Sequence, residues 1–318
     1  MNDLHSLPRF DDSLSCIYLE HGTVDKHEQS IAFHNKDGKT PIPASVLCVL
    51  MLGPGTKVTH AAVRTLAENN CLMMWCGEEN VRFYAMGMGG TRSAYRLLWQ
   101  AKIASDEVQR LEVVKRMYRK RFREPLDPGL TVQELRGKEG YRVREAYARL
   151  SKETGVKWSG RSYDRGRWAA ADPANRALSV ANSCLYGLCH AAIVSAGYSP
   201  AIGFIHTGKQ LSFVYDVADL YKVEITVPIA FRAAAEMPEQ FERAIRLRCR
   251  DMFREARLLQ RIIPDIREVL GEPSTPSGEE ALDDDPALPT ELWTPSWEQG
   301  RNGGGAPSSE EEAEGGPW

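Results

Sequence analysis

The sequence contains no apolar stretch long enough to cross a lipid bilayer. Its longest uninterrupted apolar run is Val46–Leu52, whereas a membrane-spanning helix needs about 20 such residues. The N-terminal residues Met1–Ser6 are largely polar and do not have the pattern of a secretory leader. We therefore expect a cytoplasmic protein that has no membrane partner.

Cysteine is scarce, and its spacing argues against the common zinc-binding modules. The chain has seven cysteines. Cys71 and Cys76 have four residues between them, and no second pair of matching spacing follows. An odd number of scattered cysteines is typical of a reducing compartment such as the cytoplasm.

Basic residues are not in excess over the whole chain, but they are in excess over most of it. The formal net charge is −3. Residues 271–318 contain twelve acidic residues and one basic residue, so residues 1–270 have a net charge of +8. A basic body followed by an acidic tail fits a polyanionic partner.

The first part of the chain has the short apolar runs of a β-rich region. Asn35–Gly38 has the composition of a hairpin turn, and Thr59 is a favourable N-cap for a helix over His60–Glu68. Strands are expected at Ser13–Leu19, Gln29–Phe33, Val46–Leu52, Cys71–Cys76 and Val81–Ala85.

The spacing of apolar residues becomes helical after a glycine-rich segment. One long helix or two broken ones are expected over Ser93–Phe122, and further helices at 131–153, 176–196, 213–222 and 238–262. The fold class is therefore α+β. The predicted domains are a β-rich N-terminal domain (1–86), a hinge (87–92), a larger all-α domain (93–270) and a disordered, acidic, Pro/Gly-rich tail (271–318).

The stretch His206–Lys222 has the most distinctive chemistry in the chain. Ser212 is expected to cap a helix that begins at Phe213. On that helix Asp216 and Asp219 lie three residues apart, so both carboxylates share one face. Their neighbours are apolar almost all round, and two carboxylates in such surroundings need a cation to neutralise them.

A simpler alternative remains open for this stretch. Asp216 would face solvent, Asp219 would pair with Lys222 at i+3, and His206 would be an ordinary loop histidine. A third acidic ligand elsewhere in the chain would favour the metal site over this alternative.

An acidic residue interrupts the apolar face of the helix expected at 131–153. Glu139 has an apolar neighbour four residues away on either side, where the pattern would place an apolar side chain. Gly137 and Gly140 flank it and leave room for a ligand or another backbone. Because carboxylates are rarely buried alone, Glu139 is expected either to bind a metal or to pair with an arginine from elsewhere.

These residues together predict a metal site. Glu139, His206 and Asp219 would form the ligand shell, with Asp216 beside it as a further ligand or a proton acceptor. Carboxylates and one imidazole, without a nearby cysteine, suit Mg²⁺ or Mn²⁺ better than structural zinc.

Several segments around these residues carry a specific resemblance. They are Leu135–Gly140 followed by Val143–Arg144, then Trp158–Asp164, Ser183–Gly187 and Ala196–Lys209. They resemble the CRISPR-associated integrases of spacer acquisition, and among these the type I-E subtype. The similarity extends from about Leu14 to Leu270 and does not include the tail.

The resemblance implies a reaction and a set of partners. It implies a metal-dependent DNA endonuclease and integrase of antiviral defence, which inserts short DNA fragments into a CRISPR array by 3′-hydroxyl attack on a phosphodiester. It also implies a homodimer that assembles with a small ferredoxin-like partner protein. Glu139, His206 and Asp219 match the family's metal ligands, and Asp216 lies at the edge of the site.

Basic residues are expected to bind the DNA. Lys209 and Lys222 flank the acidic cluster and would hold the scissile phosphate. The helix expected at 238–262 carries a surplus of arginines whose guanidinium groups would contact phosphates, with a solvated helix face as the alternative. Those assigned to DNA are Arg243, Arg246 and Arg250.

The resemblance adds two positions in the N-terminal domain. Arg82 matches a basic position that relatives use to contact DNA. Some relatives place a tyrosine near the end of the first strand, where it stacks on the end of a duplex. Here the residue is His21, whose ring stacks less strongly, so a plain surface histidine is the alternative.

Two other functions remain open from the sequence alone. The protein could be a metal-dependent nuclease for branched repair intermediates, or a non-catalytic DNA-binding scaffold in which Glu139 and Asp219 form structural ion pairs. The tail has tryptophans among its acids, at 293, 297 and 318. It would either dock on the partner protein or cover the basic body.

Overall fold

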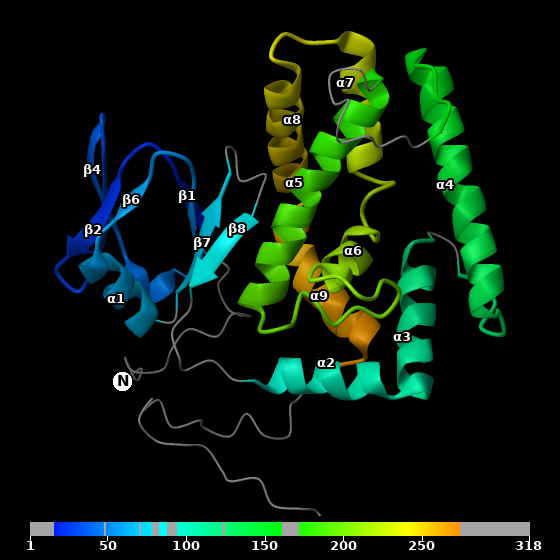
Figure 1. Ribbon diagram of the computed structural model, residues 1–318, viewed down its shortest axis with the longest axis horizontal. Coiled ribbons are helices and arrows are strands. Elements are labelled where there is room, and N and C mark those ends of the chain that lie inside the picture. The colour runs from blue at the N-terminus through cyan, green and yellow to red at the C-terminus, as the bar shows by residue number, and fades with distance from the viewer. Residues whose placement is uncertain are drawn as a thin grey trace, which may run out of the picture. The chain divides into compact units, whose positions relative to one another are not determined.

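The computed structural model describes residues 16–47, 49–69, 71–77, 83–87, 94–122, 125–160 and 172–273 (Figure 1). Arg82, most of the expected hinge and nearly all of the tail lie outside these ranges. The described residues belong to one compact unit, Met1–Gly278. The finer division at 87–92 stays a prediction.

Two four-stranded sheets form the N-terminal part of the described chain. The first has the order β1–β5–β7–β8 and the second the order β4–β3–β2–β6. The first comprises the parallel strands β1 (Cys16–Leu19), β5 (Val49–Leu52) and β7 (Leu72–Cys76), with β8 (Phe83–Gly87) antiparallel to β7. The second comprises β2 (Thr23–His27), β3 (Ser30–Asn35), β4 (Gly38–Ile42) and β6 (Lys57–Val58).

Local signals account for part of this architecture. All four residues of β5 are buried, as its apolar sequence predicts. The expected hairpin turn joins β3 to β4, with Asn35 opposite Gly38. Helix α1 (His60–Glu68) begins where predicted, and the Thr59 side chain accepts a hydrogen bond from the amide of Ala62 at 3.3 Å. Strands β2 and β4 were not predicted, because their mixed polar sequences become strands by pairing with β3.

The second part of the chain is helical, so the predicted β-rich region followed by a helical region is confirmed. Its helices are α2 (Tyr95–Ser105), α3 (Glu107–Lys120), α4 (Val132–Thr154), α5 (Pro173–Ser195), α6 (Ser212–Ala218), α7 (Thr226–Glu236), α8 (Phe241–Glu255) and α9 (Leu258–Leu270).

Of the two alternatives for Ser93–Phe122, two helices are present, because the Asp106 side chain caps α3. Three other helix predictions need correction. The segment over 238–262 is also two helices, since Arg257 has a positive φ of 47° between α8 and α9. Ser212 lies inside the first turn of α6 rather than at its N-cap, which is Leu211. Helix α7 was not predicted, although the exposed Arg232 and Glu236 lie one turn apart on the face opposite its buried residues.

Helix α5 forms the centre of the helical core. It packs against α6, α7, α8 and α9 (Figure 1). By length and composition α5 could also cross a membrane, but 72% of its apolar window is buried inside the protein, as in the core helix of a globular fold. Its sequence has no long uninterrupted apolar run, because asparagine, serine and histidine residues are interspersed among the apolar ones. Ala191 and Val194 of α5 also share a small core with residues of β5 and β7.

Candidate active site

A buried carboxylate shapes the loop that precedes α6. Asp216 is fully buried, and it accepts hydrogen bonds from the backbone amides of Phe204 at 2.6 Å, Ile205 at 3.0 Å and His206 at 2.9 Å. Three amide donors fold the loop around this one side chain. The alternative in which Asp216 faces solvent is therefore wrong.

The same carboxylate orients the His206 ring. His206 Nδ1 lies 2.7 Å from Asp216 Oδ1, and this hydrogen bond raises the pKa of His206 against the opposing effect of partial burial. Asp219 raises that pKa as well, so its charge lies within electrostatic reach of the ring. With Nδ1 engaged, Nε2 is the nitrogen left to bind a ligand, as in metal-binding histidines backed by a carboxylate.

Two further side chains fix the loop from outside. The buried Gln100 of α2 donates to the carbonyls of Ser199 at 3.0 Å and Ile202 at 2.9 Å. Arg110 of α3 donates to the carbonyl of Phe204 at 2.9 Å. The loop is therefore tied to α2, α3 and α6.

A glycine is required inside this loop. A Cβ atom at Gly203 would lie 2.2 Å from the carbonyl oxygen of His206 and 2.8 Å from Ser212 Cβ. Any side chain would force the loop open and move the imidazole.

Asp219 follows the last turn of α6 and pairs with two cations. Lys222 Nζ lies 2.5 Å from Asp219 Oδ1, so the predicted i+3 ion pair is present. Burial lowers the pKa of Lys222, but Asp219 and Tyr186 raise it, and the net shift is upward. The ammonium also lies 4.8 Å from the centroid of the Tyr186 ring. Lys222 is therefore a firmly charged group beside Asp219.

Glu139 is held within α4 itself. Its side chain is 12% exposed, which confirms that it occupies the apolar face of the helix. Arg142, one turn further along, donates through Nε at 2.8 Å and through Nη2 at 2.9 Å. The ion-pair alternative for Glu139 thus describes the contacts in the structure.

One buried guanidinium joins the two carboxylates. Arg121, at the end of α3, has a side chain that is 5% exposed. Its Nη1 lies 3.6 Å from Glu139 Oε1, and its Nη2 lies 3.7 Å from Asp219 Oδ2. Glu139 and Asp219, which are 80 residues apart in the sequence, therefore share one positive charge.

The donors around this charge are of the type that a hard divalent cation prefers. Arg121 lies between two such donors, the carboxylates of Glu139 and Asp219, and the His206 imidazole, whose Nδ1 is bound by Asp216, is the third donor expected from the sequence. Among the described residues, no three His, Cys, Asp or Glu side chains lie close enough together to bind one ion. The chemical types of Glu139, His206 and Asp219 suit Mg²⁺ or Mn²⁺, but in the described chain these side chains are too far apart to bind one ion together.

The sequence did not reveal several residues at this site. Arg121 belongs to a basic run at the end of α3, where any of several residues could have faced inward. The rings of Tyr186 and Tyr215 lie 5.1 Å apart, and Tyr215 lies 5.9 Å from His206. Tyr186 falls in the matching segment Ser183–Gly187, which was the only signal for it.

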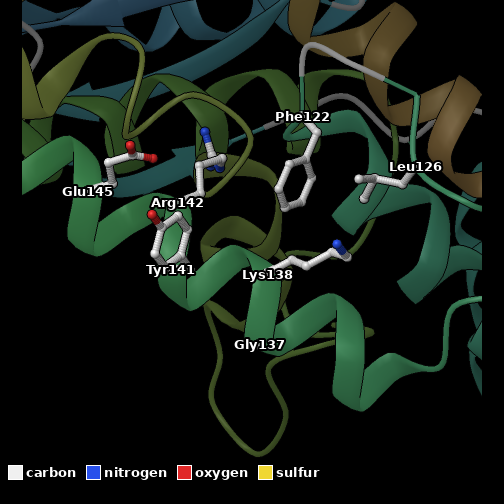
Figure 2. Close-up of a pocket in the computed structure, with 7 residues that line it drawn as sticks. All are labelled: Phe122, Leu126, Gly137, Lys138, Tyr141, Arg142 and Glu145. Atoms are coloured by element: carbon white, nitrogen blue, oxygen red, sulfur yellow. The ribbon is translucent and has the colours of Figure 1, made fainter.

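A pocket of about 540 Å³ opens on α4 beside Arg142, the residue that pairs with Glu139 (Figure 2). The Arg142 guanidinium that binds Glu139 also lies 5.4 Å from the centroid of the Phe122 ring. Gly137 borders the pocket, and a Cβ atom there would meet no atom within 4 Å. Open space is thus present at Gly137, whereas a Cβ atom at Gly140 would lie 3.4 Å from Arg144 Nη1. The pocket is lined by Phe122, Leu126, Gly137, Lys138, Tyr141, Arg142 and Glu145.

Apart from Lys222, the described lysines and arginines assigned to DNA lie in the loop before α6 and on α8. Lys209 is exposed in the loop before α6, and Arg243 and Arg250 are exposed on α8. Arg246 has an 18% exposed side chain, with Nη1 4.0 Å from Glu242 of its own helix. Arg243 Nη1 lies 3.1 Å from Gln240 Oε1, and Arg250 Nη2 lies 2.9 Å from Asp251 Oδ1, so these two arginines also contact residues of their own segment.

His21 lies in the turn after β1, exposed and with a positive φ of 54°. Its place at the end of the first strand agrees with the sequence, and its role in stacking stays a prediction. Arg82 lies outside the described residues.

Most of the chain matches the model of one protein family. The family model described as CRISPR associated protein Cas1 matches residues 17–126 and 121–244. The chain belongs to the Cas1 family. The resemblance drawn from the sequence is confirmed at family level, and the type I-E subtype stays a prediction.

Relatives of this Cas1-family protein are similar over most of their length. The CRISPR-associated endonuclease Cas1 2 of Thermus thermophilus is 54% identical over 291 residues, covering 92% of this chain and 90% of the relative. The CRISPR-associated endonuclease Cas1 of Escherichia coli is 48% identical over 260 residues, covering 81% and 85%. A crystal structure described as a TtCas1–DNA complex has 55% identity and a TM-score of 0.76, and covers 84% of this chain and all of that one.

Proposed function

We propose that this protein is a Mg²⁺- or Mn²⁺-dependent DNA endonuclease and integrase that inserts short DNA fragments into a CRISPR array. The relatives named as endonucleases and the DNA complex of a similar chain support a nuclease that acts on DNA. The observation that carries the proposal is the convergence of Glu139 and Asp219 on a single buried positive charge.

The acidic residues divide between two tasks in this proposal. Glu139, Asp219 and the Nε2 of His206 would hold the metal ion. When bound, such an ion supplies Lewis-acid activation of a phosphodiester. Asp216 is a positioning residue, since its oxygens are occupied by three backbone amides and the His206 ring. In this proposal Asp216 orients His206 and does not bind the metal.

Basic side chains would position the DNA strand. Lys222 lies against Asp219 and stays charged, so it is placed to bind a phosphate oxygen beside the reacting bond. The exposed Lys209 would contact the neighbouring backbone. Binding of the longer duplex would fall to the arginines of α8, since phosphate contacts account for much of DNA affinity.

The reaction would join a fragment to the array without hydrolysis. The 3′-hydroxyl of the fragment attacks a phosphorus atom at a repeat boundary, a new ester bond forms, and the 3′-oxygen of the cut strand leaves. The proton lost by the attacking hydroxyl passes to solvent. Alignment of nucleophile, phosphorus and leaving group is the main task of the surrounding side chains.

A strand-transfer assay tests this proposal. A labelled duplex with 3′-hydroxyl ends is incubated with a plasmid that carries a CRISPR array, in Mn²⁺, with and without a small ferredoxin-like partner protein. We expect a covalent joined product that disappears when the fragment ends in 3′-dideoxynucleotides. Cleavage of branched DNA without joining would favour the repair-nuclease alternative, and binding without either reaction would favour the scaffold.

The proposed assembly is a homodimer in the cytoplasm. We propose that it works with the small partner protein, which the family resemblance implies. Light scattering of the purified chain, alone and with that partner, measures both associations. A chain that stays monomeric under both conditions would contradict this part of the proposal.

A further inference from the structure

Arg121 is a buried cation whose hydrogen bonds are incomplete. Among the described residues, its Nε and Nη2 atoms are buried and have no hydrogen-bond partner. Its guanidinium packs 4.9 Å from the centroid of the Tyr118 ring. Buried arginines normally satisfy their donors, so these two N–H groups point to a ligand that the free protein does not supply.

Its two carboxylate contacts are also longer than hydrogen bonds. Arg121 lies 3.6 Å from Glu139 and 3.7 Å from Asp219. Each carboxylate has a closer cation of its own, Arg142 at 2.8 Å and Lys222 at 2.5 Å. Arg121 therefore supplies positive charge at the centre of the site more than it supplies hydrogen bonds.

We propose that Arg121 is a built-in counter-cation that occupies the metal position in the free protein and is displaced when metal and DNA bind. This inference rests on the proposed function. A divalent ion and a guanidinium cannot both lie between Glu139 and Asp219, because like charges at that separation repel strongly. Phosphate oxygens would satisfy the two unpaired donors of the displaced arginine.

The arrangement makes metal and DNA binding mutually dependent. DNA that draws Arg121 away leaves Glu139 and Asp219 more negative and so raises metal affinity. By linkage, the metal must raise DNA affinity by the same factor. The free protein would then have a self-neutralised site with little nuclease activity.

Removal of Arg121 leaves a protein that can fold. Arg142 and Lys222 still neutralise the carboxylates, and a methionine at position 121 keeps an apolar stem against Tyr118. Arg121→Met is therefore the test variant, and Arg121→Lys keeps the charge. Arg176→Met is a matched control, since Arg176 also pairs with a glutamate, at 3.8 Å, and lies over an aromatic ring.

The experiment measures Mn²⁺ binding to the full-length protein by electron paramagnetic resonance of the free ion. It is repeated with a short duplex that has 3′-dideoxy ends, so that strand transfer cannot begin. Without DNA, we expect Arg121→Met to bind Mn²⁺ about tenfold more tightly than the wild type, because a nearby positive charge is gone. DNA should tighten binding to the wild type and have a much smaller effect on Arg121→Met.

The controls separate this inference from the proposed function. Arg121→Lys and Arg176→Met should bind Mn²⁺ like the wild type. An unchanged Mn²⁺ affinity in folded Arg121→Met would overturn the counter-cation. If Glu139→Gln also bound Mn²⁺ normally, the metal site itself would be wrong, whereas loss of Mn²⁺ from Glu139→Gln alone would reject only the role of Arg121.

Discussion

Asp216 and Glu139 are both largely buried carboxylates, but different kinds of group stabilise them. Asp216 is held by three backbone amides and an imidazole on its own loop. Glu139 is held by the side chains of Arg142 and Arg121, which are long and can adopt other rotamers. We call Asp216 and His206 the fixed half of the candidate site, because backbone amides hold Asp216. We call Glu139 and Asp219 the movable half, because the charges of both are neutralised by lysine and arginine side chains.

The difference separates structural from catalytic use of a carboxylate. Backbone donors cannot leave without unfolding the loop, so Asp216 is committed to positioning His206. Arginine and lysine side chains can exchange for a metal ion without a change of fold. We therefore expect mutations in the fixed half to affect stability first, and mutations in the movable half to affect activity first.

The largest expected effect is a loss of strand-transfer activity when a carboxylate of the movable half is replaced. Glu139→Gln should lower Mn²⁺-dependent strand transfer by about a thousandfold or more, because one charged ligand of the metal is lost. Its free energy of unfolding should change by about 1 kcal/mol at most, since the amide can still accept a hydrogen bond from Arg142. Both quantities are measured on the same preparation.

The matched control for this variant is Glu153→Gln, an exposed glutamate on the same helix that pairs with Arg149 at 3.6 Å. It should leave both quantities unchanged. Full strand transfer by Glu139→Gln would show that Glu139 only forms a structural ion pair. The proposed difference in role between Glu139 and Asp216 would then be wrong.

The next effect is on stability, from the fixed half. Asp216→Asn should lower the free energy of unfolding by about 3 kcal/mol, because an amide group would face the backbone donors that now bind an oxygen. Urea denaturation at neutral pH measures the loss. If Asp216→Asn is as stable as the wild type while strand transfer is abolished, Asp216 acts in the chemistry and not in holding the loop.

His206 and His190 have pKa values that are shifted in opposite directions. Asp216 raises the pKa of His206, whereas burial lowers the pKa of His190, on α5, to about 4. Since the unfolded chain binds a proton at His190 first, stability should fall as pH drops from about 6.5 toward 4, by up to about 3 kcal/mol in all. Urea unfolding at several pH values should show a flatter profile for His190→Gln. An identical profile would mean that His190 is not the group that titrates.

The smallest expected effect concerns the arginines of α8, which we propose bind the longer duplex. Replacing Arg246 and Arg250 of α8 together by glutamine should flatten the dependence of log affinity on log salt by up to about two units, through fewer released counterions. Titrations of a labelled duplex at several salt concentrations measure this slope. Arg149→Gln, an exposed arginine paired with Glu153, is the control. An unchanged slope would assign the α8 arginines to intramolecular pairs.

The acidic residues could be found from the sequence because burial leaves a pattern. Glu139 interrupts an apolar helix face, and Asp216 lies in an apolar stretch, so each signals a buried charge that needs a partner. The helix over His60–Glu68 was also predictable, since its cap and its apolar face are local.

The partners of those residues could not be found in the same way. Arg121 reaches Glu139 and Asp219 only because the end of α3 packs beside α4 and α6, a tertiary contact with no local signal. The amides that bind Asp216 depend on a loop tied down by Gln100 of α2. The same applies to β2 and β4, which form by pairing with β3 rather than through their own composition.

The central claim is that Glu139, His206 and Asp219 bind one divalent ion once Arg121 has moved away. Anomalous diffraction from a crystal of the protein with Mn²⁺ and a 3′-dideoxy duplex tests it most directly. We predict one manganese peak bonded to both carboxylates and to His206 Nε2, with the Arg121 guanidinium on a phosphate and Asp216 still bound to its backbone amides. A manganese peak bonded to Asp216, or no peak between Glu139 and Asp219, would contradict the account.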